Sequence, residues 1–88
     1  MIIRILGEGR FELPDGEMSA IERLDSQLVD SLDRSDEAEF SKTLADLIGE
    51  VRQKGKLLPA DDLTPSSHAV PHEGSTLAEV KALLAQES

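Results

Sequence analysis

The chain contains no cysteine, tryptophan or tyrosine, and phenylalanine occurs only twice in 88 residues. Without cysteine it can form neither a disulfide framework nor a thiolate nucleophile, and zinc or iron–sulfur sites that rely on cysteine are excluded. A domain of this length buries only about 60–65% of the surface that its unfolded chain exposes. We therefore expect a single small domain over residues 1–88, with a thin core and an apolar face available to a partner.

Long apolar runs and an excess of basic charge are also missing. The apolar runs are a few residues long, far short of the about 20 residues that span a bilayer. The N-terminus has no basic segment followed by an apolar one, so we expect a cytoplasmic protein without direct membrane insertion. Acidic residues number 18 against 9 basic ones, for a formal net charge of −9. This charge disfavours nucleic-acid binding and favours a basic partner surface.

Residues 2–13 predict a β-hairpin. Two runs rich in β-branched and aromatic residues flank Gly7 and Gly9, and apolar and charged residues alternate along each run. A dinucleotide-binding loop is disfavoured, because a strand rather than a helix follows the glycines. An isolated hairpin is marginal, so helices or strands of another copy must cover it. The candidate self-association edge comprises Ile3, Ile5, Phe11 and Leu13.

Residues 17–54 predict an antiparallel helical hairpin. Ser19 and Glu22 match a capping box at the start of a first helix over 17–33, whose leucines recur every three or four residues. Ser35 is the expected N-cap of a second helix, which should end near Gly55. The basic cluster of Arg52, Lys54 and Lys56 is explained by the negative end of this helix dipole.

Residues 57–74 predict an extended connector, because three of the four prolines fall there. Its apolar residues could order it by contacting the helices; they are Leu57, Leu58, Leu63 and Val70. A short C-terminal helix over 75–86 should follow, with Ser75 or Thr76 as its cap and Glu79 completing a capping box. Its apolar stripe comprises Leu77, Val80, Leu83 and Leu84. At this length the helix must dock to be stable.

Residues that carry chemistry are few, and their spacing is unfavourable. His68, His72 and Asp61 offer metal-ligand types, but Pro71 lies between the histidines and opposes a shared helical face. The sequence has no nucleophile elbow, and its paired carboxylates are explained by helix capping and solvation. We therefore predict no enzyme, no metal site and no cofactor, and keep a metal-dependent enzyme only as a third alternative.

The acidic helical segment is the most informative feature of the surface. A net charge of −9 on so small a domain favours docking on a basic surface. The candidate partner-binding residues are Asp25, Asp30, Asp33, Asp36 and Glu37.

The residue pattern resembles one known family across nearly the whole chain. The opening Met-Ile-Ile-Arg-Ile-Leu-Gly-Glu-Gly with Phe11, the acidic start of the second helix at 36–40, and the Ser-Thr-Leu-Ala-Glu-Val run at 75–80 resemble the PspA-associated domain, PspAA. The resemblance implies a non-enzymatic component of the phage-shock, or envelope-stress, system. PspA itself is a coiled-coil protein that polymerises on the inner membrane and protects it.

Together these patterns predict an α+β fold in which the N-terminal hairpin packs on an antiparallel helix pair and a short C-terminal helix follows a Pro-rich connector. The predicted function is that of an adaptor or regulatory protein that associates with a PspA-type protein and lies peripheral to the inner membrane through it. The alternative is a structural module that forms homo-oligomers, such as a homodimer, by pairing its hairpins.

Overall fold

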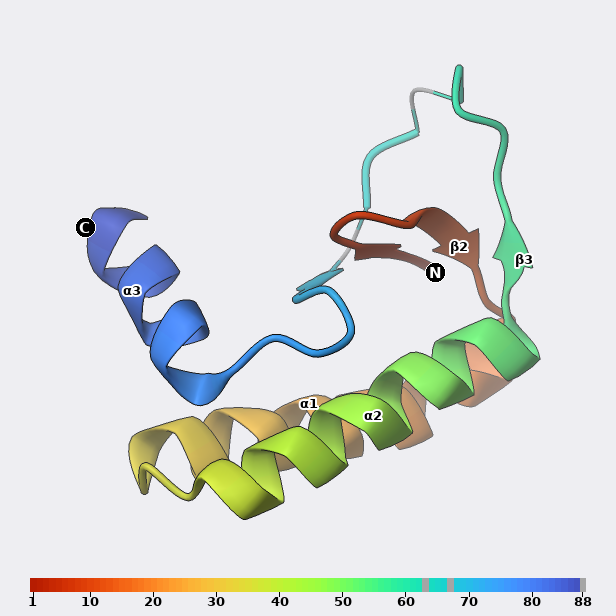
Figure 1. The fold of residues 1–88 in the computed structure, drawn as a ribbon. Helices are drawn as coiled ribbons and strands as arrows, with labels where there is room; N and C mark the ends of the chain where they lie inside the picture. Colours follow the sequence, from red (N-terminus) through yellow and green to blue (C-terminus); the bar gives the residue numbers. More distant parts are fainter. Residues whose placement is uncertain (63, 67, 88) are drawn as a thin grey trace.

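The computed structural model describes residues 1–62, 64–66 and 68–87, and it confirms the α+β class (Figure 1). The elements are β1 (Ile2–Ile5), β2 (Gly9–Glu12), a 3-10 turn η1 (Asp15–Glu17), α1 (Met18–Asp33), α2 (Glu37–Lys54), β3 (Lys56–Leu57), β4 (His68–Val70) and α3 (Leu77–Glu87). Strands β3, β2, β1 and β4 form one sheet in that order. Helices α1 and α2 pack against each other and lie along one side of this sheet in Figure 1.

The predicted hairpin is confirmed. Strands β1 and β2 pair antiparallel, with Ile3 opposite Phe11 and Ile5 opposite Gly9. Both glycines of the connection have a positive φ, +87° at Gly7 and +127° at Gly9, a conformation that side chains with a Cβ rarely adopt. The backbone of the β1–β2 connection therefore favours glycine at both positions.

The predicted connector over 57–74 differs from the structure at both of its ends. Strand β3 pairs antiparallel with β2, and β4 pairs parallel with β1, with Val70 opposite Ile5. Val70 is buried at 2% exposure, whereas Leu57 remains 56% exposed. These strands are too short to show a period in the sequence, and their pairing depends on a hairpin distant in the chain. Leu63 lies outside the described residues.

Both helices of the hairpin form as predicted, but their caps differ. Helix α1 begins at Met18 directly after η1, and no side chain caps it, so the predicted role of Ser19 is wrong. Asp36, not Ser35, is the N-cap of α2, and its Oδ1 accepts a hydrogen bond from the Glu39 N–H at 3.1 Å. Ser35 instead takes a left-handed conformation with φ 55° in the turn between the helices.

The core lies between the sheet and the three helices. Its fully buried apolar side chains come from β1, from the residue that follows β2 and from both long helices; the largest are Phe40, Ile3, Ile5, Leu13, Ile21, Leu47, Ile48 and Val51. Helix α3 adds Leu77 and Val80, which are 8% and 6% exposed. The Glu79 N–H donates to Thr76 Oγ1 at 3.1 Å, which confirms Thr76 as a cap. The side chains of Leu83 and Leu84 lie outside the described part.

Candidate partner-binding surface

Helix α1 presents one side that mixes acidic and apolar side chains. Residues separated by three or four positions share a side of an α-helix, and that spacing joins five residues, which we call the α1 stripe: Met18, Glu22, Asp25, Val29 and Asp33. Met18 and Val29 are 40% and 49% exposed, which is unusual for large apolar side chains in this chain. The α1 stripe therefore offers both carboxylates and apolar surface to a partner.

The five predicted partner-binding acids fall into two groups. Asp25 and Asp33 lie on the α1 stripe, and within the described residues neither makes an ion pair. Asp30 and Asp36 already have internal partners, because Arg34 Nε lies 2.9 Å from Asp30 Oδ2 and Asp36 caps α2.

Glu37 is exposed in the first turn of α2. A carboxylate in that position is explained locally by the positive end of the helix dipole. Among the predicted residues, those on the α1 stripe are therefore the most available to a partner. The sequence pattern did not single out Met18 and Val29, because only the helix orientation shows which apolar residues stay outside the core.

The four residues of the predicted self-association edge lie in the core. Ile3 and Ile5 are fully buried, and Phe11 and Leu13 are 8% and 2% exposed. Each hairpin strand also has a second neighbour, since β3 covers β2 and β4 covers β1. A second copy would therefore have to pair with β3 or β4 instead of the hairpin itself. Self-association stays a prediction, which light scattering over a range of protein concentrations would test.

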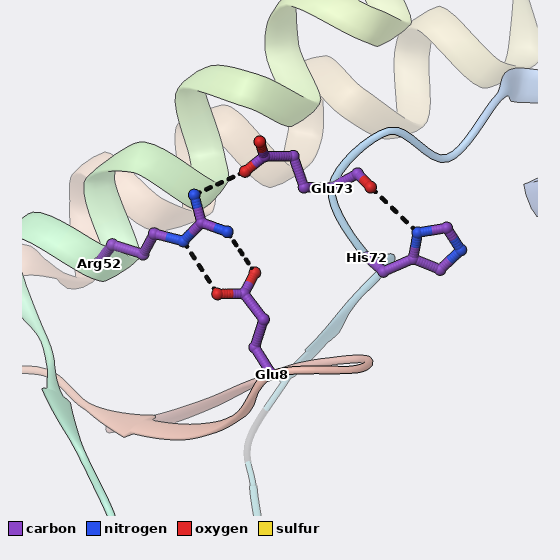
Figure 2. A network of polar contacts seen from close by, with 4 residues as sticks. All are labelled: Glu8, Arg52, His72 and Glu73. Carbon is purple, nitrogen blue, oxygen red and sulfur yellow. Dashed lines mark hydrogen bonds and ion pairs between the residues drawn. The ribbon is translucent and has the colours of Figure 1, made fainter.

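Arg52 joins three parts of the chain that are distant in sequence (Figure 2). Its Nε and Nη2 donate to the carboxylate of Glu8, in the β1–β2 turn, at 2.9 and 2.6 Å. Its Nη1 donates to Glu73 Oε2, in the loop between β4 and α3, at 2.5 Å. The hydrogen bonds that Arg52 donates to Glu8, and then the one that it donates to Glu73, raise the pKa of the Arg52 guanidinium above its usual value.

The Arg52 contacts tie both loops to α2. From the sequence, Arg52 is explained by the helix dipole alone. Its hydrogen bonds are not predicted, because Glu8 and Glu73 lie 44 and 21 positions from Arg52 in the chain. His72 lies beside this network, where its Nδ1 is 3.1 Å from the Glu73 carbonyl oxygen (Figure 2).

The residues of the metal-dependent alternative are not assembled into a site. His68 is partly buried on β4, whereas His72 and Asp61 are exposed in separate loops. Within residues 1–62, 64–66 and 68–87, no group of three or more His, Asp or Glu side chains is placed to hold a metal ion. The structure therefore gives this alternative no support. No helix in the same part of the chain has the length and apolar character needed to cross a membrane.

Comparison with known proteins identifies a family. A protein-family model described as PspA-Associated protein, PspAA, matches residues 1–88. No curated protein and no solved structure matches the chain. The family match spans every helix and strand described above, including the α1 stripe and the Arg52 contacts.

Proposed function

Because the chain belongs to the PspA-associated protein family, we propose that it is a non-enzymatic adaptor that binds a PspA-type coiled-coil protein. The observation that carries this proposal is the family match over the whole chain, residues 1–88. The adaptor is cytoplasmic and reaches the inner membrane through its partner. Its role there is regulation of the envelope-stress response.

We place the contact with the partner on the α1 stripe. A formal charge of −9 attracts a basic surface and raises the rate of encounter. The exposed side chains of Met18 and Val29 supply apolar area that solvated carboxylates alone lack. A matching partner surface is one side of a helix that carries basic residues around an apolar centre, which a coiled-coil protein can provide.

Titration of the purified protein against its cognate PspA homologue, at low and at high salt, tests the proposal. We expect saturable binding that weakens as salt is added, because salt screens exposed charges. The double charge reversal Asp25→Lys with Asp33→Lys should weaken binding by about tenfold or more. Its fold should be unaffected, since Asp33 is exposed, Asp25 is only partly buried, and neither makes an ion pair within the described residues.

The matched control is Asp61→Lys together with Glu12→Lys, which makes the same change of charge on exposed residues that are not part of α1 or α2. If this control weakens binding as much as the α1 variant, overall charge and not the α1 stripe governs the interaction. If the unmodified protein binds at neither salt concentration, the adaptor function is wrong.

A further inference from the structure

The face of the sheet that points away from the helices carries a hollow of about 610 Å³. Arg4 of β1 and Arg10 of β2 line it, because they alternate along their strands with the buried residues of the core. The chain that follows β3 rises on this side of the sheet in Figure 1 and supplies apolar walls. These walls include Leu58, Pro59 and Pro65, together with Leu57 at the end of β3.

The two arginines are direct neighbours across the hairpin, since Arg4 pairs with Arg10 in the register of β1 and β2. Like charges directly opposite one another destabilise a pair of strands. In the part of the chain that the structure describes, no carboxylate lies within ion-pair distance of either guanidinium. Arg10 Nη1 donates instead to a neutral group, the Thr64 carbonyl oxygen, at 2.8 Å.

Nearby carboxylates are already engaged elsewhere. Glu8 lines the same hollow, but both of its oxygens accept hydrogen bonds from Arg52. Asp62 is close enough for the charge of Arg10 to contribute to its lowered pKa, yet its Oδ1 accepts from the Thr64 N–H. The repulsion between Arg4 and Arg10 is therefore not relieved by a carboxylate in contact with either of them.

A second hollow makes the comparison clear. It has a volume of about 510 Å³, and its lining combines Lys54, Lys56 and the N-terminal residue Met1 with Glu12 and Asp15. Charged groups there face groups of opposite sign, because Lys56 lies opposite Glu12 across β2 and β3 and the Met1 ammonium lies 3.6 Å from Asp15 Oδ1. Arg4 and Arg10 instead face each other.

We infer that the hollow lined by Arg4 and Arg10 binds a phosphate ester. Guanidinium groups donate paired hydrogen bonds that match phosphate oxygens, and a phosphate monoester carries about −1.5 to −2 charges at neutral pH, which two arginines neutralise. The hollow is much larger than a phosphate group. Its apolar wall of Leu57, Leu58 and Pro59 therefore contacts the organic part of the ester. The ester is either a soluble metabolite or the headgroup of a lipid.

This site does not depend on the adaptor function, because it lies on the opposite side of the sheet from α1 and α2. The two arginines make the hollow locally positive, although the protein as a whole is negatively charged. A ligand that enters the hollow removes the repulsion between Arg4 and Arg10, so the bound state should be more stable than the empty one.

Nuclear magnetic resonance titration tests the inference. Inorganic phosphate and glycerol 3-phosphate should each cause saturable shifts at the Gly9 amide and at the Arg4 and Arg10 Nε–H groups. Sodium acetate at equal ionic strength should cause smaller, unsaturated shifts. Vesicles of phosphatidylcholine with and without phosphatidic acid distinguish a lipid ligand from a soluble one. If the ligand is a lipid, the protein should be retained on the vesicles that contain phosphatidic acid. If the ligand is a soluble metabolite, the protein should not be retained on them.

Arg4→Gln and Arg10→Gln should each weaken phosphate binding by about tenfold or more, as the loss of charged hydrogen bonds predicts. Arg23→Gln is the control, because it removes the same charge from the exposed side of α1. Arg4→Gln removes the repulsion and breaks no hydrogen bond of the described structure, so its melting temperature should be unchanged or higher, and its loss of binding cannot be attributed to unfolding. Arg10→Gln also loses the bond to the Thr64 carbonyl oxygen, so Arg4→Gln is the decisive variant. Equal weakening in Arg23→Gln, or no binding of any phosphate probe, would overturn the inference.

Discussion

Two glycines of the second long helix and its end, Gly49 and Gly55, have opposite surroundings. A Cβ added to Gly55, where α2 ends, would lie 2.6 Å from the Val51 carbonyl oxygen and 3.1 Å from Phe11 Cβ. A Cβ added to Gly49, on the exposed side of α2, would meet nothing within 4 Å. Gly55 is therefore required by close packing between α2 and the hairpin, whereas Gly49 is not required by any contact in the described structure.

Alanine substitution at these two positions should have opposite effects. Gly55→Ala should lower the free energy of unfolding by about 1–3 kcal/mol, because backbone must move to admit the methyl group. Gly49→Ala should raise it by about 0.5–1 kcal/mol, because alanine loses less conformational freedom in a helix. Urea unfolding followed by circular dichroism measures both. A neutral Gly55→Ala would show that the end of α2 adjusts freely.

The loop after β3 contains one carboxylate with a perturbed pKa. Hydrogen bonds from the side chain and the backbone N–H of Thr64 lower the pKa of Asp62 below 3.8, and the charge of Arg10 acts in the same direction. Because the folded pKa is lower than the unfolded one, the stabilisation is complete above pH 3.8 and is lost as the pH falls through the folded pKa.

An NMR titration of the Asp62 carboxyl should therefore give a midpoint below 3.8. In Thr64→Ala the hydrogen bond from the side chain is lost, so the midpoint should move up towards 3.8 while the backbone bond remains. A midpoint that is the same in both proteins would show that the Thr64 hydroxyl does not stabilise the charged form.

At the scale of elements, the C-terminal part of the chain is held by few contacts. Leu77 and Val80 of α3 reach the core, and Lys81 Nζ donates to Ser35 Oγ in the α1–α2 turn. The bond from Arg52 to Glu73 fixes the loop between β4 and α3 to α2, and the bonds from Arg52 to Glu8 fix the β1–β2 turn to the same helix. Since surface ion pairs contribute little to global stability, we expect them to control local opening instead.

Arg52→Gln should speed hydrogen exchange of the β4 and α3 amides while leaving exchange in the centre of α2 nearly unchanged. The control is Arg34→Gln, whose contacts with Asp30 and Asp36 stay within the α1–α2 turn. Hydrogen exchange followed by mass spectrometry measures both variants. Unchanged protection of β4 and α3 in Arg52→Gln would show that their apolar contacts hold them without the arginine.

At the scale of the whole molecule, the excess of negative charge destabilises the compact fold. The 18 acidic and 9 basic residues leave a net charge of −9 on a fold with a radius of gyration of 12.8 Å. Repulsion among the excess negative charges destabilises the compact state. Salt weakens this repulsion, and at 0.1 M the screening length is about 10 Å.

The melting temperature should therefore rise when sodium chloride is increased from about 10 mM to about 200 mM, concentrations between which the screening length falls from about 30 Å to under 10 Å. Differential scanning calorimetry at constant pH measures it. The opposite result, a lower melting temperature in salt, would show that ion pairs such as those of Arg52 outweigh the repulsion.

The sequence by itself determined the elements whose signal is local. The alternation around Gly7 and Gly9 identified the hairpin, and the leucine spacing identified both long helices, because each pattern reports which side of an element must be buried. The resemblance of the same residues to the PspA-associated family is supported by the match over residues 1–88.

Only the tertiary structure decided the features that join distant positions. Strand β4 pairs with β1, which lies more than 60 positions earlier in the chain. Arg52 binds Glu8, which precedes it in the sequence, and Glu73, which follows it. The cap at Asp36, the uncapped start of α1 directly after η1, the exposure of Val29 and the facing arginines also depend on how the elements pack. A short strand or a single charged residue carries no period, so its partner is fixed by three-dimensional contact alone.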